Sequence, residues 1–126
     1  MPDNNVVILI VEDQLDLREI LAELLSYNDL AADLAGSAEE ALQLLAQNSY
    51  AGAIIDLGLP HISGTELVKM IRSEPATRAL PCVAMTAWHD AEMKRRALEA
   101  GFNAYFSKPF VPETVILELK AAIALS

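Results

Sequence analysis

Short apolar runs alternate with amphipathic segments along the whole chain. The first run, residues 6–11, consists of valine, isoleucine and leucine, which is typical of a central strand covered on both faces. Leucine and isoleucine then recur at helical spacing over residues 17–25 and form one stripe of a helix. This order of elements predicts a βα unit.

The same unit is repeated four more times. A weaker second strand covers residues 31–34, and later strands cover 51–55, 82–85 and 102–106. The last helix carries the stripe Val115, Ile116, Leu119 and Ile123. Two further helices are predicted to begin with capping boxes, Ser37 with Glu40 and Ser63 with Glu66. A third is capped by Asp90 and ends at Gly101.

Five strands in strict alternation with five helices indicate an α/β fold, a doubly wound parallel sheet with right-handed crossovers. A length of 126 residues with 53% hydrophobic residues suits one domain, 1–126. The lone Cys82 cannot form an internal disulfide, and no apolar run approaches the roughly 18 residues that a membrane span needs. The sequence therefore predicts a cytoplasmic protein with no membrane contact.

The formal net charge is −9, which argues against direct nucleic-acid binding, because phosphate neutralisation requires clustered basic residues. The short basic run 94–96 is typical of a solvated helix face. The excess of acidic residues is concentrated in the first half of the chain, since residues 1–65 hold eleven of the eighteen acids and a single base, Arg18. The first half of the chain is therefore the place to look for a bound cation.

Polar residues stand where four of the predicted strands end: Glu12 and Asp13, Asp56, Thr86, and Lys108. In a parallel sheet these ends meet at one edge, which is where such folds bind ligands. Three carboxylates brought together repel one another unless a cation joins them, and hard oxygen ligands suit Mg²⁺. With the Lys108 ammonium and the Thr86 hydroxyl, this edge is suited to a phosphoryl group, with Asp56 as the nucleophile.

Each of these residues also has an ordinary structural interpretation. Asp56 could be a turn residue, the acidic pair could cap the first helix, and Lys108 could be a solvated loop lysine. The functional hypothesis rests on their coincidence at one edge. His61 and His89 lack neighbours at metal-ligand spacing and are interpreted as surface residues.

The pattern resembles the receiver domain of two-component response regulators over nearly the whole chain. The resemblance rests on four motifs: Glu12-Asp13, Asp56 followed by Pro60 and Gly64, Met85-Thr86-Ala87, and Lys108-Pro109-Phe110. It implies a flavodoxin-like sheet of strand order 2-1-3-4-5. It also implies a phosphoacceptor that catalyses only its own phosphorylation and autodephosphorylation, and not an enzyme acting on other substrates.

The resemblance assigns a role to each position. Asp56 accepts the phosphoryl group from a histidine phosphate and Lys108 pairs with its oxygens, with a cis Lys108-Pro109 bond. The switch residues Thr86 and Tyr105 alter the surface of the fourth helix, fifth strand and fifth helix. The Mg²⁺ ligands are Asp13, Asp56 and the Gly58 carbonyl, with Glu12 acting through water.

The implied partners are a sensor histidine kinase or a histidine phosphotransfer protein, and a downstream protein target. The donor is expected to dock on the first helix, beside Gln14, Leu15 and Arg18. Asn103-Ala104 precede Tyr105 and the last helix carries only Lys120 as a base, which argues against the dimer of DNA-binding regulators and leads us to expect a monomer or weak dimer. Met1 at the front and no linker after Ser126 favour a single-domain protein. Trp88, two residues after Thr86, is a possible gate over the site.

Three alternatives stay open from the sequence. The chain could be a pseudo-receiver that acts as a scaffold without phosphate, or a receiver fragment of a hybrid histidine kinase. It could also be a phosphatase with an aspartate nucleophile. Such enzymes usually carry a second acid two residues after the nucleophile, where this chain has Gly58.

Overall fold

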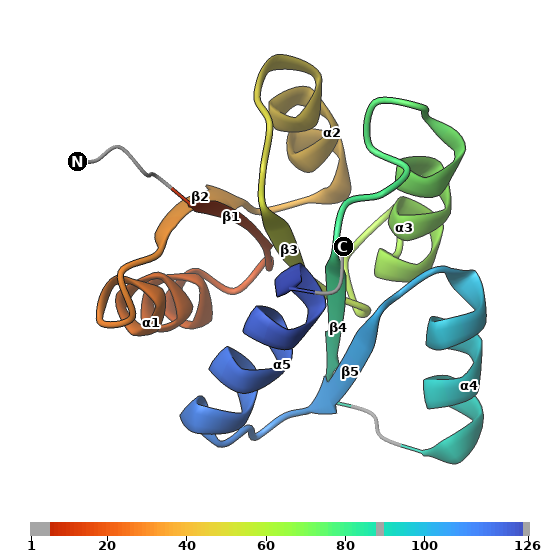
Figure 1. The fold of residues 1–126 in the computed structure, drawn as a ribbon. Coiled ribbons are helices and arrows are strands. Elements are labelled where there is room, and N and C mark those ends of the chain that lie inside the picture. Colours follow the sequence, from red (N-terminus) through yellow and green to blue (C-terminus); the bar gives the residue numbers. More distant parts are fainter. Residues whose placement is uncertain (1–5, 88–89, 125–126) are drawn as a thin grey trace.

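The computed structural model describes residues 6–87 and 90–124 (Figure 1). Strands and helices alternate strictly, as the sequence predicts. The elements are β1 (Val7–Val11), α1 (Leu15–Ser26), β2 (Ala31–Ala35), α2 (Ala38–Gln47), β3 (Gly52–Asp56), α3 (Gly64–Ser73), β4 (Cys82–Thr86), α4 (Ala91–Ala100), β5 (Ala104–Ser107) and α5 (Pro112–Ala124).

The five strands form one parallel sheet in the order β2-β1-β3-β4-β5. Helices α1 and α5 pack on one face, and α2, α3 and α4 pack on the other (Figure 1). This arrangement confirms the predicted flavodoxin-like fold and its strand order. Central strands of such a sheet are covered on both faces, which explains their continuous apolar runs.

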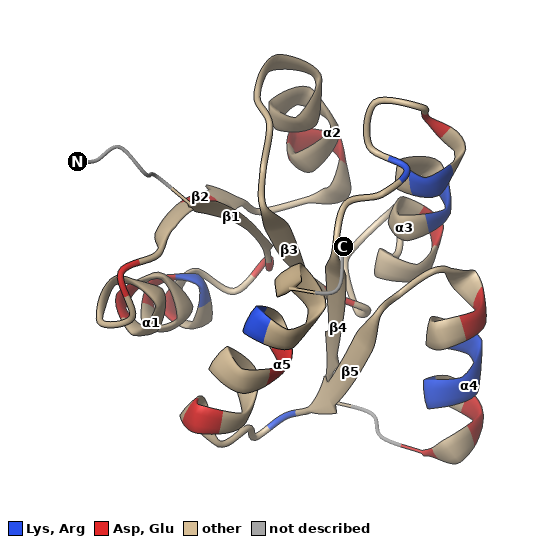
Figure 2. Cartoon of the chain, in the orientation of Figure 1, with Lys and Arg blue, Asp and Glu red and all other residues tan. Residues whose placement is uncertain are grey.

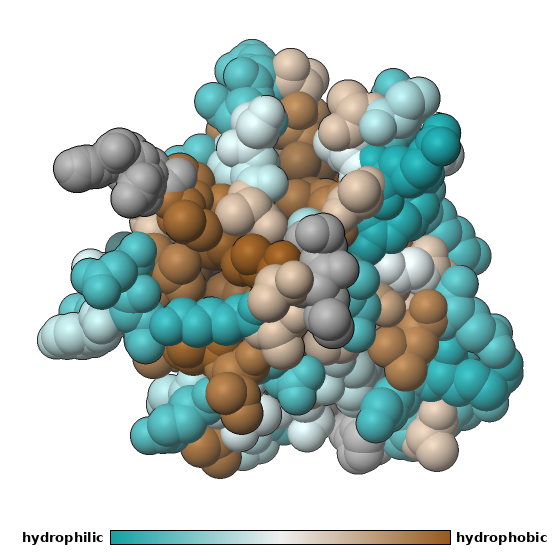
Figure 3. Space-filling view, viewed as in Figure 1, coloured by the Kyte–Doolittle hydropathy of each residue, from teal (hydrophilic) through white to brown (hydrophobic). Residues whose placement is uncertain are grey.

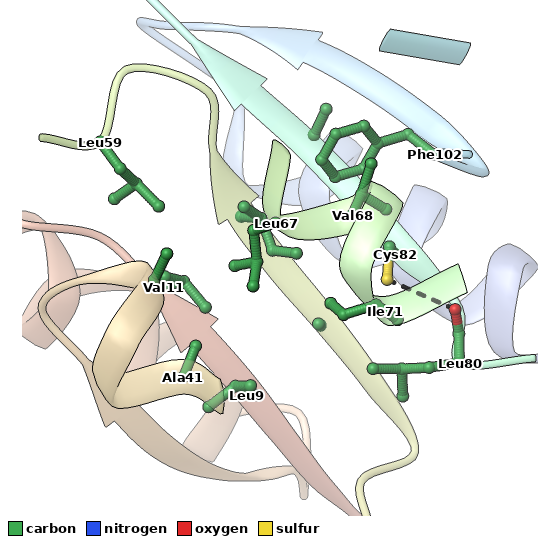
Figure 4. Close-up of a cluster of buried hydrophobic side chains, with 14 of the residues drawn as sticks. Leu9, Val11, Ala41, Leu59, Leu67, Val68, Ile71, Leu80, Cys82 and Phe102 are labelled. Carbon is green, nitrogen blue, oxygen red and sulfur yellow. Dashed lines mark hydrogen bonds between the residues drawn. The ribbon is translucent and has the colours of Figure 1, made fainter. Parts of the chain in front are cut away.

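Alternate side chains of each central strand enter different cores. In β1, Leu9 and Val11 pack against α2 and α3, whereas Ile8 and Ile10 pack against α1 and α5. Figure 4 shows the first of these clusters, in which Cys82 lies close to Ile71 and Leu80. The two cores fix the orientation of the sheet between the helical layers, so that the strand ends are held in place.

The predicted helix starts are observed, with one difference in detail. Ser63 and Glu66 form a complete capping box, with bonds of 3.1 and 3.0 Å, and the Asp90 carboxylate accepts the Met93 N–H at 2.7 Å. The pair of Ser37 and Glu40 at the start of α2 forms only half of a capping box. Ser37 accepts the Glu40 N–H, but the Glu40 carboxylate accepts the N–H of Gly36 instead of that of Ser37.

The predicted bounds of the fifth strand were wrong by two residues at its start. The strand begins at Ala104, not at Phe102. Phe102 lies in the turn after α4, where Gly101 has φ 131°, and its buried ring packs into the core beside α3. An apolar residue is needed at this position because its ring fills the core from the turn. Sequence periodicity does not distinguish such a turn residue from a residue of the following strand.

The side chain of Arg72, near the end of α3, is hydrogen-bonded to the segments at the amino-terminal end of the sheet. Its four hydrogen bonds reach three carbonyl oxygens and one side-chain oxygen: Gly101 at 2.9 Å, Arg78 at 3.0 Å, Leu80 at 2.7 Å, and Asn103 Oδ1 at 3.0 Å. Asn103 Oδ1 also accepts the N–H of Cys82, the first residue of β4, at 2.8 Å. Helix α3 is thereby tied to the segments that lead into β4 and β5.

The helix surfaces differ in polarity. Arg95 and Arg96 of α4 pair with Glu92 and Glu99 on the same helix, so that acidic and basic positions interleave there (Figure 2). This confirms the interpretation of the basic run as a solvated face. By contrast, apolar surface gathers between α1 and α5 (Figure 3). Within residues 6–87 and 90–124, no helix has the length and apolar character to cross a bilayer.

Candidate functional site

Three carboxylates meet at the carboxyl edge of the sheet. Glu12 follows β1 directly, Asp13 comes next, and Asp56 is the last residue of β3. One carboxylate oxygen from each of the three lies within 4.8 Å of the other two. The Glu12 side chain is fully buried and Asp56 is 5% exposed, whereas Asp13 is open to solvent. The cluster therefore has a closed inner side and one ligand facing outward.

Lys108 crosses from the end of β5 to join two of these acids. Its Nζ donates to Glu12 Oε1 at 3.0 Å and to Asp56 Oδ2 at 3.3 Å. The remaining oxygens accept backbone N–H groups, from Gln14 to Glu12 Oε2 and from Gly58 to Asp56 Oδ1, both at 3.0 Å. Each buried carboxylate is thus held through both of its oxygens, which fixes its direction.

Burial and charge act on the pKa values of this group in opposite ways. Burial raises the pKa of Glu12, as does nearby Asp56, although the Gln14 N–H and Lys108 oppose this change. For Lys108, burial alone would lower the pKa, but the Glu12 and Asp56 carboxylates outweigh it and the pKa is raised. The ammonium therefore stays charged at neutral pH. One cation faces three acids, and their hard oxygen atoms suit Mg²⁺.

Backbone packing sets the position of Asp56. A Cβ on Gly64, the first residue of α3, would lie 2.4 Å from the Asp56 carbonyl oxygen. Only glycine permits this close approach of the helix to the strand end. A Cβ on Gly58 would meet Asp56 Oδ1 at an ordinary 3.7 Å, so the packing around Asp56 does not require glycine at this position.

Residues on β4 and β5 approach the start of α4. Thr86, at the end of β4, is 2% exposed, and its Oγ1 donates to Met93 Sδ at 3.7 Å. Burial raises the pKa of half-buried Tyr105, and the Asp90 carboxylate at the start of α4 raises it further. The Lys108 N–H donates to the Thr86 carbonyl at 2.7 Å, and the Lys108-Pro109 peptide bond is cis.

The structure brings together the carboxylates and the lysine that the sequence placed at strand ends. Sequence reasoning missed Met93, because a methionine seven residues after Thr86 on an amphipathic helix carries no signal of a contact with it. Trp88, the predicted gate, and His89 lie outside the described residues. His61 is exposed in the loop after β3, as expected.

A parallel sheet of this order, with three carboxylates and a lysine at its carboxyl edge, defines a receiver-type signalling domain. The family model of the response regulator receiver domain matches residues 8–120. The chain therefore belongs to the response regulator receiver family. Members of this family are signalling domains that bind Mg²⁺ at an acidic pocket and interact with sensor kinases or phosphotransfer proteins.

The chain is also similar to individual curated proteins. An uncharacterized 14.6 kDa protein of Leptolyngbya boryana is 35% identical over 109 residues, which make up 86% of this chain and 83% of that protein. Response regulator MprA of Mycobacterium sp. (strain KMS) is 32% identical over 116 residues, or 92% of this chain. The matched part is 50% of MprA, so the chain spans about half the length of that relative.

Solved structures give the same result. A protein of Chloroflexus aurantiacus J-10-fl, whose crystal structure is described as that of a response regulator, superposes with a TM-score of 0.92 at 36% identity. The match covers 96% of this chain and 99% of that one. A sensor protein from Polaromonas sp. JS666 gives a TM-score of 0.89 at 29% identity, over 98% of each chain. Similar folds thus occur in proteins whose structures are described under both of these terms, response regulator and sensor protein.

Proposed function

We propose that the chain is a response regulator receiver that accepts a phosphoryl group on Asp56 from a phosphohistidine in a Mg²⁺-dependent reaction. The donor is a sensor kinase or a histidine phosphotransfer protein. The observation that carries this proposal is the state of Asp56. Its carboxylate is buried, oriented by the Gly58 N–H and Lys108, and grouped with two further carboxylates within 4.8 Å.

In the proposed reaction an Asp56 carboxylate oxygen forms a bond to phosphorus, while the bond from phosphorus to the histidine nitrogen breaks and the imidazole leaves. Mg²⁺ held by Asp13, Asp56 and the Gly58 carbonyl, with Glu12 acting through water, would neutralise charge on the phosphoryl oxygens. Lys108 already contacts Asp56 and would pair with those oxygens as the negative charge arrives.

Phosphorylation then acts through Thr86 and Tyr105 on the surface of α4, β5 and α5, and the signal passes by protein contact. A ligand shifts such an equilibrium only through contacts that differ between its two states. The Thr86 hydroxyl gains such a contact when a phosphoryl oxygen is present. We expect the phosphodonor to dock on α1 at Gln14, Leu15 and Arg18, and the protein to be a cytoplasmic monomer or weak dimer.

The proposal is tested by intact-mass measurement after incubation with acetyl phosphate and Mg²⁺. The wild type is expected to gain one phosphoryl group, and Asp56→Asn is expected to gain none, because an amide is not a nucleophile here. Asp29→Asn is the matched control. Asp29 is an exposed turn residue with φ 62°, a conformation that asparagine tolerates, so this variant should gain phosphate normally.

Two outcomes would contradict the proposal. A folded wild type that gains no phosphoryl group under these conditions would favour a scaffold that acts without phosphate. An Asp56→Asn variant that still gains one would place the acceptor at another residue. Turnover of a small phosphate ester by the wild type would favour a phosphatase instead.

A further inference from the structure

The first turn of α4 contacts the phosphoryl site through sulfur. Met93 occupies the third position of α4, and the Asp90 cap fixes its backbone N–H. From there its side chain reaches back to the end of β4, where Thr86 Oγ1 donates to Met93 Sδ at 3.7 Å. Thr86 is the residue to which the proposed function assigns the phosphoryl-sensing hydroxyl.

The Thr86 hydroxyl has a single proton to donate. Phosphoryl oxygens only accept hydrogen bonds, so a contact from Thr86 to a phosphoryl group must use that same proton. The hydrogen bond to Met93 Sδ and the hydrogen bond to the phosphoryl group therefore compete. A thioether is a weak acceptor, which makes the contact easy to give up when a charged acceptor arrives.

The Met93 side chain also has space to move into when Thr86 leaves it. Met93 lines a recess of about 390 Å³ between the loop after β3 and the start of α4. Leu57, the neighbour of Asp56, and Thr65 form one side of the recess, and Glu92 and Arg96 of α4 form the other. A flexible, unbranched thioether can reorient within such a space at low cost.

We propose that the Met93 thioether holds the Thr86 hydroxyl in the unphosphorylated protein, so that phosphorylation releases the first turn of α4 by withdrawing that hydroxyl. This inference rests on the proposed function and adds a positioning residue to it. Met93 contacts neither the carboxylates nor Lys108 in any recorded hydrogen bond, and it acts only through Thr86.

Two substitutions at this position are expected to act in opposite directions. Met93→Leu keeps the apolar bulk but removes the thioether acceptor, so beryllofluoride, a phosphoryl mimic, no longer competes with Met93 for the Thr86 proton and should bind about two- to fivefold more tightly. Met93→Gln supplies a stronger acceptor of similar length, so beryllofluoride should bind more weakly by a similar factor. Both affinities are measured by titration calorimetry at saturating Mg²⁺.

The controls separate this role from a general effect on packing. Met70→Leu makes the same chemical change on the exposed face of α3 and should leave the affinity for beryllofluoride unchanged. Mg²⁺ affinity without beryllofluoride should be the same in both Met93 variants, because Met93 is not among the carboxylates that group around the metal position. A packing defect would instead change stability and Mg²⁺ affinity together.

Equal affinities for beryllofluoride in wild type, Met93→Leu and Met93→Gln would overturn the inference, as would shifts of both variants in the same direction. These results differ from a failure of the proposed function. If the wild type neither binds beryllofluoride nor gains a phosphoryl group, the proposed function itself fails. If the wild type does both and the variants match it, only the role of Met93 is wrong.

Discussion

The two ends of the sheet hold a partly buried basic side chain in different ways. At the amino-terminal end, Arg72 donates to three carbonyl oxygens and to Asn103, so its charge is distributed over acceptors that belong to the same chain. At the carboxyl end, Lys108 is paired with the two buried carboxylates of Glu12 and Asp56. The exposed Asp13 adds a third carboxylate to this cluster. The Arg72 guanidinium thus has its hydrogen-bond acceptors within the chain, whereas the carboxylate cluster keeps an excess of negative charge.

This difference separates groups that serve folding from groups that serve a ligand. A buried polar group that only holds the fold is most stable when the chain itself supplies all of its partners. A cluster with excess negative charge lowers stability until a cation joins it. The two ends should therefore respond in opposite ways to mutation and to Mg²⁺.

The largest expected effect is at the amino-terminal end. Arg72→Met keeps the side-chain stem but removes four hydrogen bonds, and it should lower the free energy of unfolding by about 3 kcal/mol. Urea denaturation measures this loss. Phosphoryl gain on the folded variant should be unchanged, and a loss of phosphorylation without a loss of stability would remove the distinction between the two ends.

The next effect is at the carboxyl end. Mg²⁺ at 100 times its dissociation constant should raise the free energy of unfolding by about 2.7 kcal/mol, because the ion binds only the folded cluster. Asp13→Asn removes one negative ligand, so the same Mg²⁺ concentration should stabilise that variant less. Urea denaturation with Mg²⁺ and with EDTA tests both statements, and Arg72→Met should keep the full Mg²⁺ response.

The smallest effect is a pH dependence in EDTA. Folding raises the pKa of Glu12, mainly through burial, so its contribution to stability is fully present below its unfolded pKa and is lost as the pH rises through the folded value. Relative to Glu12→Gln, the wild type should therefore lose stability as the pH rises above the unfolded pKa of glutamate, about 4.3. Glu23→Gln makes the same chemical change at an exposed position of α1, away from the carboxylate cluster, and is the matched control. An opposite slope would mean that Lys108 outweighs burial at Glu12.

Much of the fold follows from local patterns. The order of elements, the side-chain caps of Ser37, Ser63 and Asp90 and the buried central strands agree with apolar periodicity and capping residues. The strand ends also bring Glu12, Asp56 and Lys108 together, since parallel strands share one carboxyl edge. Residues far apart in the chain are thus placed by topology, which a sequence pattern records well.

The remaining features depend on contacts that no pattern records. Phe102 is apolar because it fills a core from a turn, and the Glu40 carboxylate accepts the N–H of Gly36, outside the spacing of a capping box. The bonds of Arg72 and the contact between Met93 and Thr86 join residues of different elements, so the periodicity within one helix or strand does not predict them. Such pairings are decided by side-chain packing in three dimensions.

The burial of Cys82 has a practical consequence for spectroscopy. The thiol is fully buried, donates to the Leu80 carbonyl at 3.3 Å (Figure 4), and has its pKa raised to about 11 by burial, against the opposing effect of Arg72. Alkylating labels react with the thiolate, which is scarce for this residue at neutral pH. A cysteine introduced at exposed Leu98 of α4 or Leu117 of α5 would therefore take up a fluorophore or spin label selectively in the otherwise unaltered protein.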